Sequence, residues 1–218
     1  GLLSQVKHKL TSPKPKLPRD YLRYVNRIVR RIFPKGWDSA YENNVVTAAP
    51  NISACVETSR SGGGMLRELG RIRSEFVDGV GFQNFGGQQT FIEKALGQSE
   101  LSVDRVKAKL IVVQSAGKPR PLTKFESETF CLQPLHRTIY NGLPKKWLLR
   151  GDVTNEILTH AGFHDQSMKV SGDYKSATDN LPIEVAEEIL QVLEDSSISV
   201  PRSIWEYAKR SLRPEVQY

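Results

Sequence analysis

Cysteine and long apolar runs are the features that this sequence of 218 residues has least of. Its two cysteines, Cys55 and Cys131, form neither a CxxC pair nor a disulfide framework, so a reducing compartment fits best. Together with four scattered histidines they cannot build a structural zinc site. No apolar run approaches the length of about 18 residues that a membrane span needs, and the first residues lack the layout of a signal peptide. A disulfide-rich secreted domain and a membrane-spanning protein are therefore not expected.

The composition is otherwise that of an ordinary globular protein. Apolar residues make up 39% of the chain and charged residues 25%, which excludes wholesale disorder. The length suits one large domain or two small ones. We therefore expect a chain that folds around a buried apolar core.

Positive charge is concentrated at the N-terminus. The formal net charge is +7, but residues 1–35 hold ten Lys and Arg side chains and a single acid, Asp20. A clustered basic arm suits a polyanion such as RNA, because Lys and Arg displace the counterions that are condensed on phosphates. A solvated helix face is an equally open alternative. The candidate RNA-binding residues are Arg23, Arg27, Arg30 and Arg31.

Apolar periodicity, prolines and glycines predict a mixture of helices and strands. The prolines of residues 11–18 predict an extended linker, and the runs 107–114 and 118–124 predict a basic hairpin with its turn at 115–117. A further short strand is predicted at 169–174. Helices are predicted at 20–33, 65–72, 134–141, 154–161, 182–194 and 200–212. This mixture predicts an α+β fold.

Two acids stand out in the segment SGDYKSATDNL, residues 171–181. Asp173 is predicted at the end of a strand, and Asp179 at the point where the chain turns into a helix. A carboxylate on such a rigid element can bridge two Mg²⁺ ions in phosphoryl transfer, and the second acid can accept a hydrogen bond from a ribose hydroxyl. Both acids also have a plain structural interpretation, Asp179 as a helix cap and Asp173 as a turn residue.

The same segment, SGDYKSATDNL, resembles the catalytic motif A of viral RNA-directed RNA polymerases. The likeness is to the lineage of leviviruses, narnaviruses, mitoviruses and the ourmia-like botourmiaviruses. KPRPLTK, residues 118–124, is similar to the basic motif F of that lineage and precedes motif A at the expected distance. SRSGGGMLREL and LHRTIYNGLPKKWLLRGDV also look ourmia-like. The resemblance covers roughly residues 20–218, and motifs F and A are its specific parts.

This resemblance implies a right-hand polymerase, present as an N-terminal fragment with the fingers and the beginning of an incomplete palm. Residues 1–36 would be a basic arm and helix, 37–168 the fingers with the motif F hairpin, and 169–218 the start of the palm. The implied activity is RNA-templated nucleotidyl transfer with Mg²⁺ or Mn²⁺, in replication of a viral genome. The implied partners are the viral RNA template and product and nucleoside triphosphates, in the host cytoplasm or in the mitochondrion.

The resemblance also implies roles for particular residues. Asp173 matches the aspartate that binds both metal ions, and the carbonyl of Tyr174 matches a further metal ligand. Asp179 matches the acid that senses the 2′-hydroxyl of the incoming nucleotide, although it stands one residue further along than in many polymerases. Lys107 and Lys109 either support the nucleotide channel or, as we favour, solvate a strand edge. The cations that match residues around the incoming triphosphate are Lys118, Arg120 and Lys124.

Two motifs of the family are missing from this sequence. A complete polymerase needs the glycine-serine loop of motif B and the Gly-Asp-Asp of motif C, whereas the only Gly-Asp pairs are Gly151-Asp152 and Gly172-Asp173. We therefore expect no polymerisation by this chain alone, and a second polypeptide is one possible source of motifs B and C. The alternatives are a non-catalytic RNA-binding module and a reverse transcriptase, which usually has an aromatic gate where Thr178-Asp179 stand.

Aromatic residues and the second cysteine have structural interpretations. Trp37, Trp147 and Trp205 are expected to pack in the core or the fingers rather than to stack on bases. Cys131 is expected to be a small buried apolar residue rather than a nucleophile.

Overall fold

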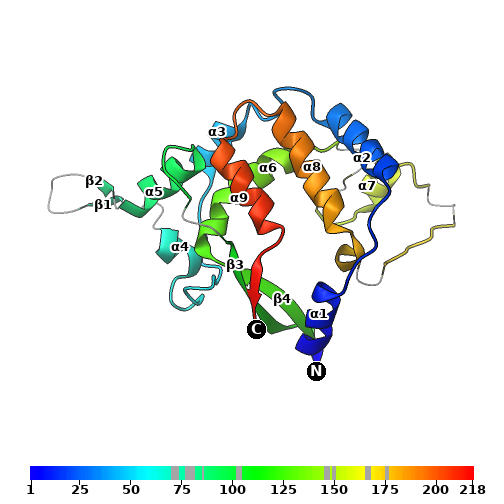
Figure 1. The fold of residues 1–218 in the computed structure, drawn as a ribbon, viewed down its shortest axis with the longest axis horizontal. Helices are drawn as coiled ribbons and strands as arrows, with labels where there is room; N and C mark the ends of the chain where they lie inside the picture. The colour runs from blue at the N-terminus through cyan, green and yellow to red at the C-terminus, as the bar shows by residue number, and fades with distance from the viewer. Residues whose placement is uncertain are drawn as a thin grey trace.

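The computed structural model describes residues 1–69, 74–76, 82–84, 86–101, 105–144, 148, 151–164, 168–174 and 177–218. Helices dominate, and a small sheet lies beneath them, which confirms the α+β class (Figure 1). The helices are α1 (Leu2–Thr11), α2 (Arg19–Ile32), α3 (Tyr41–Thr47), α4 (Gly64–Leu69), α5 (Gly86–Ala95), α6 (Gln133–Gly142), α7 (Asn155–His160), α8 (Ile183–Ser196) and α9 (Arg202–Ser211). Two short 3₁₀ helices are η1 (Ser127–Leu132) and η3 (Thr178–Asn180).

The strands form one hairpin and one three-stranded sheet. The hairpin pairs β1 (Ser74–Phe76) with β2 (Phe82–Asn84). The sheet has the order β4-β3-β5, with β3 (Lys107–Ser115), β4 (Lys118–Phe125) and β5 (Glu215–Gln217). Strand β3 is antiparallel to β4 and parallel to β5, so the last residues of the chain extend the sheet that the basic hairpin begins.

Helix α2 shows how the basic N-terminal arm is attached to the rest of the chain. Its apolar residues recur at helical spacing, with Val25 and Ile32 half-buried and Val29 7% exposed. This face packs against α8, and Asn26 Nδ2 donates a 2.7 Å hydrogen bond to Glu188 Oε1. The helix predicted at 20–33 is thus confirmed, and it joins the two ends of the chain.

The core lies among α3, α5, η1, α6, α8 and α9, where Tyr41, Phe91 and Trp205 are almost fully buried. Trp37 packs edge-on against Trp205, with the ring centroids 6.4 Å apart, and Cys131 is completely buried. The packing roles predicted for these two tryptophans and for Cys131 are confirmed, whereas Trp147 lies outside the described residues. Burial raises the pKa of the Cys131 thiol to about 12, so this cysteine stays protonated.

A buried carboxylate fixes the connection between α8 and α9. Asp38 has no exposed surface, and its oxygens accept hydrogen bonds from the backbone N–H groups of Ile198, Ser199 and Val200 at 2.9–3.2 Å. The Ser197 hydroxyl donates a further one. Burial by itself raises the pKa of Asp38, but these hydrogen bonds outweigh it and hold the pKa below its ordinary value. Asp38 lies in the loop between α2 and α3, so one carboxylate ties the first third of the chain to the last.

The basic hairpin predicted at 107–124 is confirmed. Strands β3 and β4 pair from Ala108 and Phe125 out to Ser115 and Lys118. Both residues of the two-residue turn have positive φ, 50° for Ala116 and 73° for Gly117, as the tightest hairpin turns require. Glycine adopts this backbone freely, whereas alanine does so at a cost.

Ala116→Gly is therefore expected to stabilise the protein slightly, by about 0.5–1 kcal/mol. The reciprocal change Gly117→Ala should destabilise it by a similar amount, because the added Cβ meets no neighbour and only the backbone conformation is penalised. Thermal unfolding of both variants measures the difference. A lower melting temperature for Ala116→Gly would contradict this account of the turn.

The prediction of a short strand at 169–174 is wrong. Residues 168–174 have no regular structure, and every one of them is exposed. The stretch has one β-branched residue, Val170, and β3, β4 and β5 pair only with one another. A strand forms only where a neighbour takes up its hydrogen bonds, so the local pattern was insufficient.

The predicted helices at 65–72, 134–141, 154–161, 182–194 and 200–212 match α4, α6, α7, α8 and α9 to within a few residues, although residues 70–72 lie outside the described part.

Within the described residues, no helix combines the length and the apolar character that crossing a membrane demands.

Candidate nucleotide and nucleic-acid site

Three predicted nucleotide-binding cations lie together on β4. Lys118, Arg120 and Lys124 are at even positions of one strand, so their side chains leave the same face of the sheet. Lys118 and Arg120 are exposed near the turn, and Lys124 is half-buried near the base. No acidic side chain of the described residues forms an ion pair with any of the three. Their charge is therefore available to an anion.

Lys109 joins this face; its side chain is exposed to solvent, as expected, but it does not lie at a strand edge. Strand β3 is the central strand of the sheet, and Lys109 lies directly opposite Lys124. Two like charges on paired residues repel each other, so the arrangement is unfavourable unless an anion neutralises them. Sequence reasoning missed the pairing because it placed Lys109 beside an edge rather than across from motif F.

An apolar cleft of about 580 Å³ opens on the same face of the sheet. Ile111, Val113 and Leu122 line it from the strands, and Phe130 and Leu132 line it from η1. Lys124 and His136 are among the few polar residues in its wall. An apolar cleft beside a row of cations can receive a ligand that has a flat apolar part and an anionic part.

Glu57 holds the base of this hairpin in place. Its carboxylate accepts the backbone N–H of Ser127 at 3.1 Å and the Ser127 hydroxyl at 2.9 Å. The neighbouring Val56 N–H donates to the Phe125 carbonyl at 3.0 Å, at the end of β4. Partial desolvation raises the pKa of Glu57, but hydrogen bonds from its own backbone and from Ser127 outweigh this and lower the pKa. Nothing in the sequence pattern indicated this residue.

Asp173 and Tyr174 lie apart from the hairpin cations. Both are in the exposed stretch 168–174, and the Tyr174 side chain is 84% exposed. Within the described part of the chain, neither side chain makes a hydrogen bond or an ion pair with β4. The structure thus brings the hairpin cations Lys118, Arg120 and Lys124 together without placing Asp173 against them.

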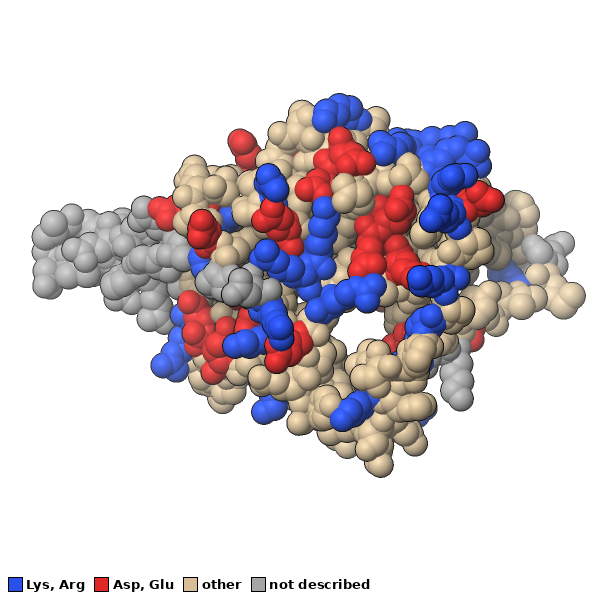
Figure 2. Space-filling view, viewed as in Figure 1, with Lys and Arg blue, Asp and Glu red and all other residues tan. Residues whose placement is uncertain are grey.

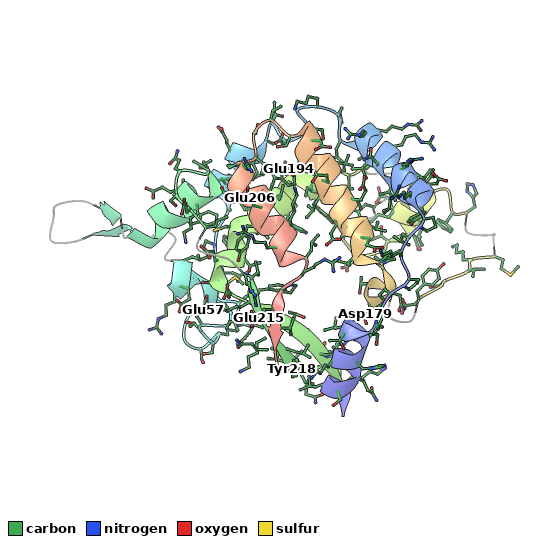
Figure 3. The ribbon with its side chains drawn as sticks, viewed as in Figure 1. Glu57, Asp179, Glu194, Glu206, Glu215 and Tyr218 are labelled. Atoms are coloured by element: carbon green, nitrogen blue, oxygen red, sulfur yellow. The ribbon has the colours of Figure 1, made fainter. Side chains whose placement is uncertain are left out.

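Asp179 is held by the N-terminal arm. It lies in η3, between α1 and the start of α8 (Figure 3), where its carboxylate accepts a 3.2 Å hydrogen bond from Lys9 Nζ. The N-cap of α8 is Pro182, so Asp179 does not cap that helix. Its side chain remains 60% exposed, which leaves oxygen surface for another donor. Sequence reasoning missed Lys9, which lies 170 residues away from its partner.

The described residues do not complete a site for Mg²⁺ or Mn²⁺. No group of three or more His, Cys, Asp or Glu side chains among them is arranged to hold a metal ion. Asp173 is one exposed carboxylate, and Asp179 is paired with Lys9. Two divalent ions need more oxygen ligands than these. The metal-binding roles of Asp173 and Tyr174 therefore stay predictions.

The four candidate RNA-binding arginines lie on α2, where Lys and Arg side chains gather on the surface (Figure 2). Arg23 forms a 3.2 Å ion pair with Asp20, and the Arg27 guanidinium lies 5.5 Å from the centre of the Tyr24 ring. Arg30 bonds to Asn26 and to Asp195 of α8, so its guanidinium helps to attach α2. Arg31 is exposed and has no ion pair with a described residue.

No protein-family model, curated protein or solved structure matches this chain.

Proposed function

We propose that this chain supplies the fingers and the beginning of the palm of a viral RNA-directed RNA polymerase of the ourmia-like lineage. The observation that carries the proposal is the ordered pair of segments KPRPLTK and SGDYKSATDNL. The first of these forms one strand of a hairpin with its cations on a single face, as a site for a triphosphate requires. In the complete enzyme, motifs B and C come from further sequence or from a second polypeptide.

The hairpin face has the chemistry of a nucleotide. The apolar cleft lined by Ile111, Val113 and Leu122 suits a base, and the exposed cations Lys118 and Arg120 suit its phosphates. Fixed cations there would neutralise the triphosphate and the leaving pyrophosphate. Asp179, with its exposed carboxylate surface, would accept a hydrogen bond from the ribose 2′-hydroxyl, and Asp173 would provide one ligand to the metal ions.

The hairpin cations provide the first test of this function. In the protein that contains this chain together with motifs B and C, we expect Lys118→Gln/Arg120→Gln to lower kcat/KM for nucleotide incorporation by about a hundredfold, because two cations near the triphosphate are lost. The charge-conserving variant Lys118→Arg/Arg120→Lys should keep most of the activity. Incorporation by RNA-templated extension at several nucleotide concentrations measures both. Equal kcat/KM for the wild type and the charge-removing variant would contradict the role of the hairpin.

A non-catalytic RNA-binding module is the second candidate function, and the basic face of α2 favours it. The two functions differ in a simple way. A module retains salt-dependent RNA binding but incorporates no nucleotide, even when motifs B and C are present. A full-length protein that binds RNA and shows no templated incorporation would replace the polymerase proposal with the module.

A further inference from the structure

A second cleft is basic, and it shares no described lining residue with the apolar cleft or with α2. It has a volume of about 520 Å³ and is formed where β3 begins and where α9 passes into β5. Among the described residues, seven line it; four of these are cations, and Glu215 is the one acid. The cations are Arg105, Lys209, Arg210 and Arg213.

Carboxylates outside the cleft position two of these cations. Arg213 makes a two-pronged contact with Glu187 of α8 through Nε and Nη2, and this contact lowers the pKa of the Glu187 carboxyl. Lys209 bonds to Glu194 and, at 3.0 Å, to Gln191. A guanidinium has five N–H donors and an ammonium has three, so each cation keeps donors beyond those that its carboxylate uses. The ion pairs thus hold Lys209 and Arg213 in place and leave some of their N–H donors for a ligand.

The negative C-terminal end of α9 accounts for only two of the four cations in the cleft. Cations are favourable in the last turn of a helix because they interact with its negative end, and Lys209 and Arg210 occupy that turn of α9. Arg105 belongs to a different segment, just before β3, and Arg213 follows the helix. These two residues add guanidinium groups to the cleft that the end of α9 does not account for, and each is paired with a carboxylate, Glu215 or Glu187. The side chain of Arg105 is 77% exposed, and its ion pair with Glu215 is a loose 3.6 Å.

The cleft borders an opening in the molecular surface. Figure 2 shows Lys and Arg side chains over the C-terminal half of α9, and beside them an opening that passes between α8, α1 and the sheet. The acidic side chains of α8 lie beside these Lys and Arg side chains (Figure 2). In Figure 3, Glu215 stands at the start of β5, on the sheet side of this opening. A ligand at the cleft is therefore reached from open solvent.

We infer that the cleft of Arg105, Lys209, Arg210 and Arg213 binds phosphate groups, and that the phosphodiester backbone of single-stranded RNA is their source. Guanidinium groups match phosphate oxygens in pairs, and backbone contacts of this kind do not depend on base sequence. The site is distinct from the predicted nucleotide-binding face and from the arginines of α2. It does not depend on catalysis, so it stands even if the chain is not part of a polymerase.

The inference is tested by binding of a fluorescent single-stranded RNA to the 218-residue chain across a salt series. Arg105→Gln/Arg210→Gln removes two cleft cations and leaves the Lys209–Glu194 and Arg213–Glu187 pairs intact. Because each phosphate contact contributes about 0.7 to the slope of log K against log salt, the slope should become shallower by about 1.4. The control Arg60→Gln/Arg202→Gln removes the same charge from exposed positions outside the cleft and should leave the slope unchanged. Equal slopes for the two double variants would overturn the inference.

A second variant keeps the test decisive if the first one folds poorly. Glu215→Gln removes the one acid that the described residues contribute to the cleft wall and leaves all four cations. It should tighten RNA binding by about two- to fivefold at low salt, because the competing exposed ion pair with Arg105 is lost. Unchanged or weaker binding by a folded Glu215→Gln protein would count against the site.

The source of the phosphate is distinguished by a second ligand. Binding of a fluorescent nucleoside triphosphate is measured on the same variants. If only RNA binding changes in Arg105→Gln/Arg210→Gln, the backbone is the source, as inferred. If only triphosphate binding changes, the cleft is a phosphate site for free nucleotides and the RNA assignment is overturned. Because neither measurement uses incorporation, failure here is separate from failure of the polymerase proposal.

Discussion

Asp173→Asn is expected to reduce nucleotide incorporation by about a thousandfold in a protein that contains this chain with motifs B and C. A metal-binding carboxylate provides several kcal/mol of transition-state stabilisation, and about 4 kcal/mol corresponds to a thousandfold in rate. The amide keeps the size and shape of the carboxylate, so the folded state should be unaffected. The exposed surroundings of Asp173 support this, because no described residue pairs with its side chain. Single-turnover incorporation with a saturating nucleotide isolates the chemical step.

The sequence provides a matched control for this variant. Gly151-Asp152 is the other Gly-Asp pair, it is also exposed, and it lies outside the segment 171–181. Asp152→Asn makes the same change of charge and should incorporate nucleotide at the wild-type rate. If the two variants have equal activity, the role given to Asp173 fails, and with it the strongest part of the polymerase proposal.

Asp38→Ala is expected to lower the free energy of unfolding by about 3–5 kcal/mol, the largest effect on stability that we predict. The change leaves three backbone N–H groups and the Ser197 hydroxyl without their acceptor in a buried loop. Denaturant unfolding at pH 7 measures the loss. Asp20→Ala is the matched control, because Asp20 is 91% exposed in its ion pair with Arg23 and should cost less than about 1 kcal/mol. Similar losses for the two variants would contradict the role of Asp38.

The same carboxylate predicts an acid sensitivity. The pKa of Asp38 in the folded state lies below its unfolded value of about 3.9. Its contribution to stability is therefore complete well above pH 4 and is lost as the pH falls through the folded pKa. The difference in stability between the wild type and Asp38→Ala should be constant from about pH 6 to 7 and should shrink below about pH 4. A difference that grows on acidification would reverse the sign of the argument.

Local sequence patterns predicted the helices and strands that are determined by interactions between residues close together in the sequence. The apolar spacing of α8 and the β-branched run of β3 each required only neighbouring residues. Strand β5 has three residues and exists through its parallel pairing with β3, so no local pattern indicated it. Helix α3 (YENNVVT) contains two asparagines and three β-branched residues, which are poor helix formers, and Tyr41 and Val45 keep it helical by packing in the core. Helices α1 and α5 were also missed.

The candidate site divides in the same way. The sequence predicted that 118–124 is an extended segment, and the two-residue period of a strand places Lys118, Arg120 and Lys124 on one face of it. The pairing of Lys109 with Lys124 depends on strand register, and the contact of Lys9 with Asp179 joins distant parts of the chain. Neither is encoded by spacing along the sequence. The regions 1–36, 37–168 and 169–218 stay a prediction, although α2 of the first packs against α8 of the third.

The packing of α2 on α8 has a consequence for synthesis on the ribosome. Asn26 and Glu188 are 162 residues apart, so at about 5–20 residues per second α2 waits roughly 10–30 s for its partner to be made. During that time its apolar stripe, which includes Val25 and Val29, faces water beside a row of arginines. A nascent chain in this state is amphipathic and strongly cationic, and it attracts chaperones and the surrounding ribosomal RNA alike. The helix that is anchored by α8 in the finished protein therefore lacks that partner while translation is under way.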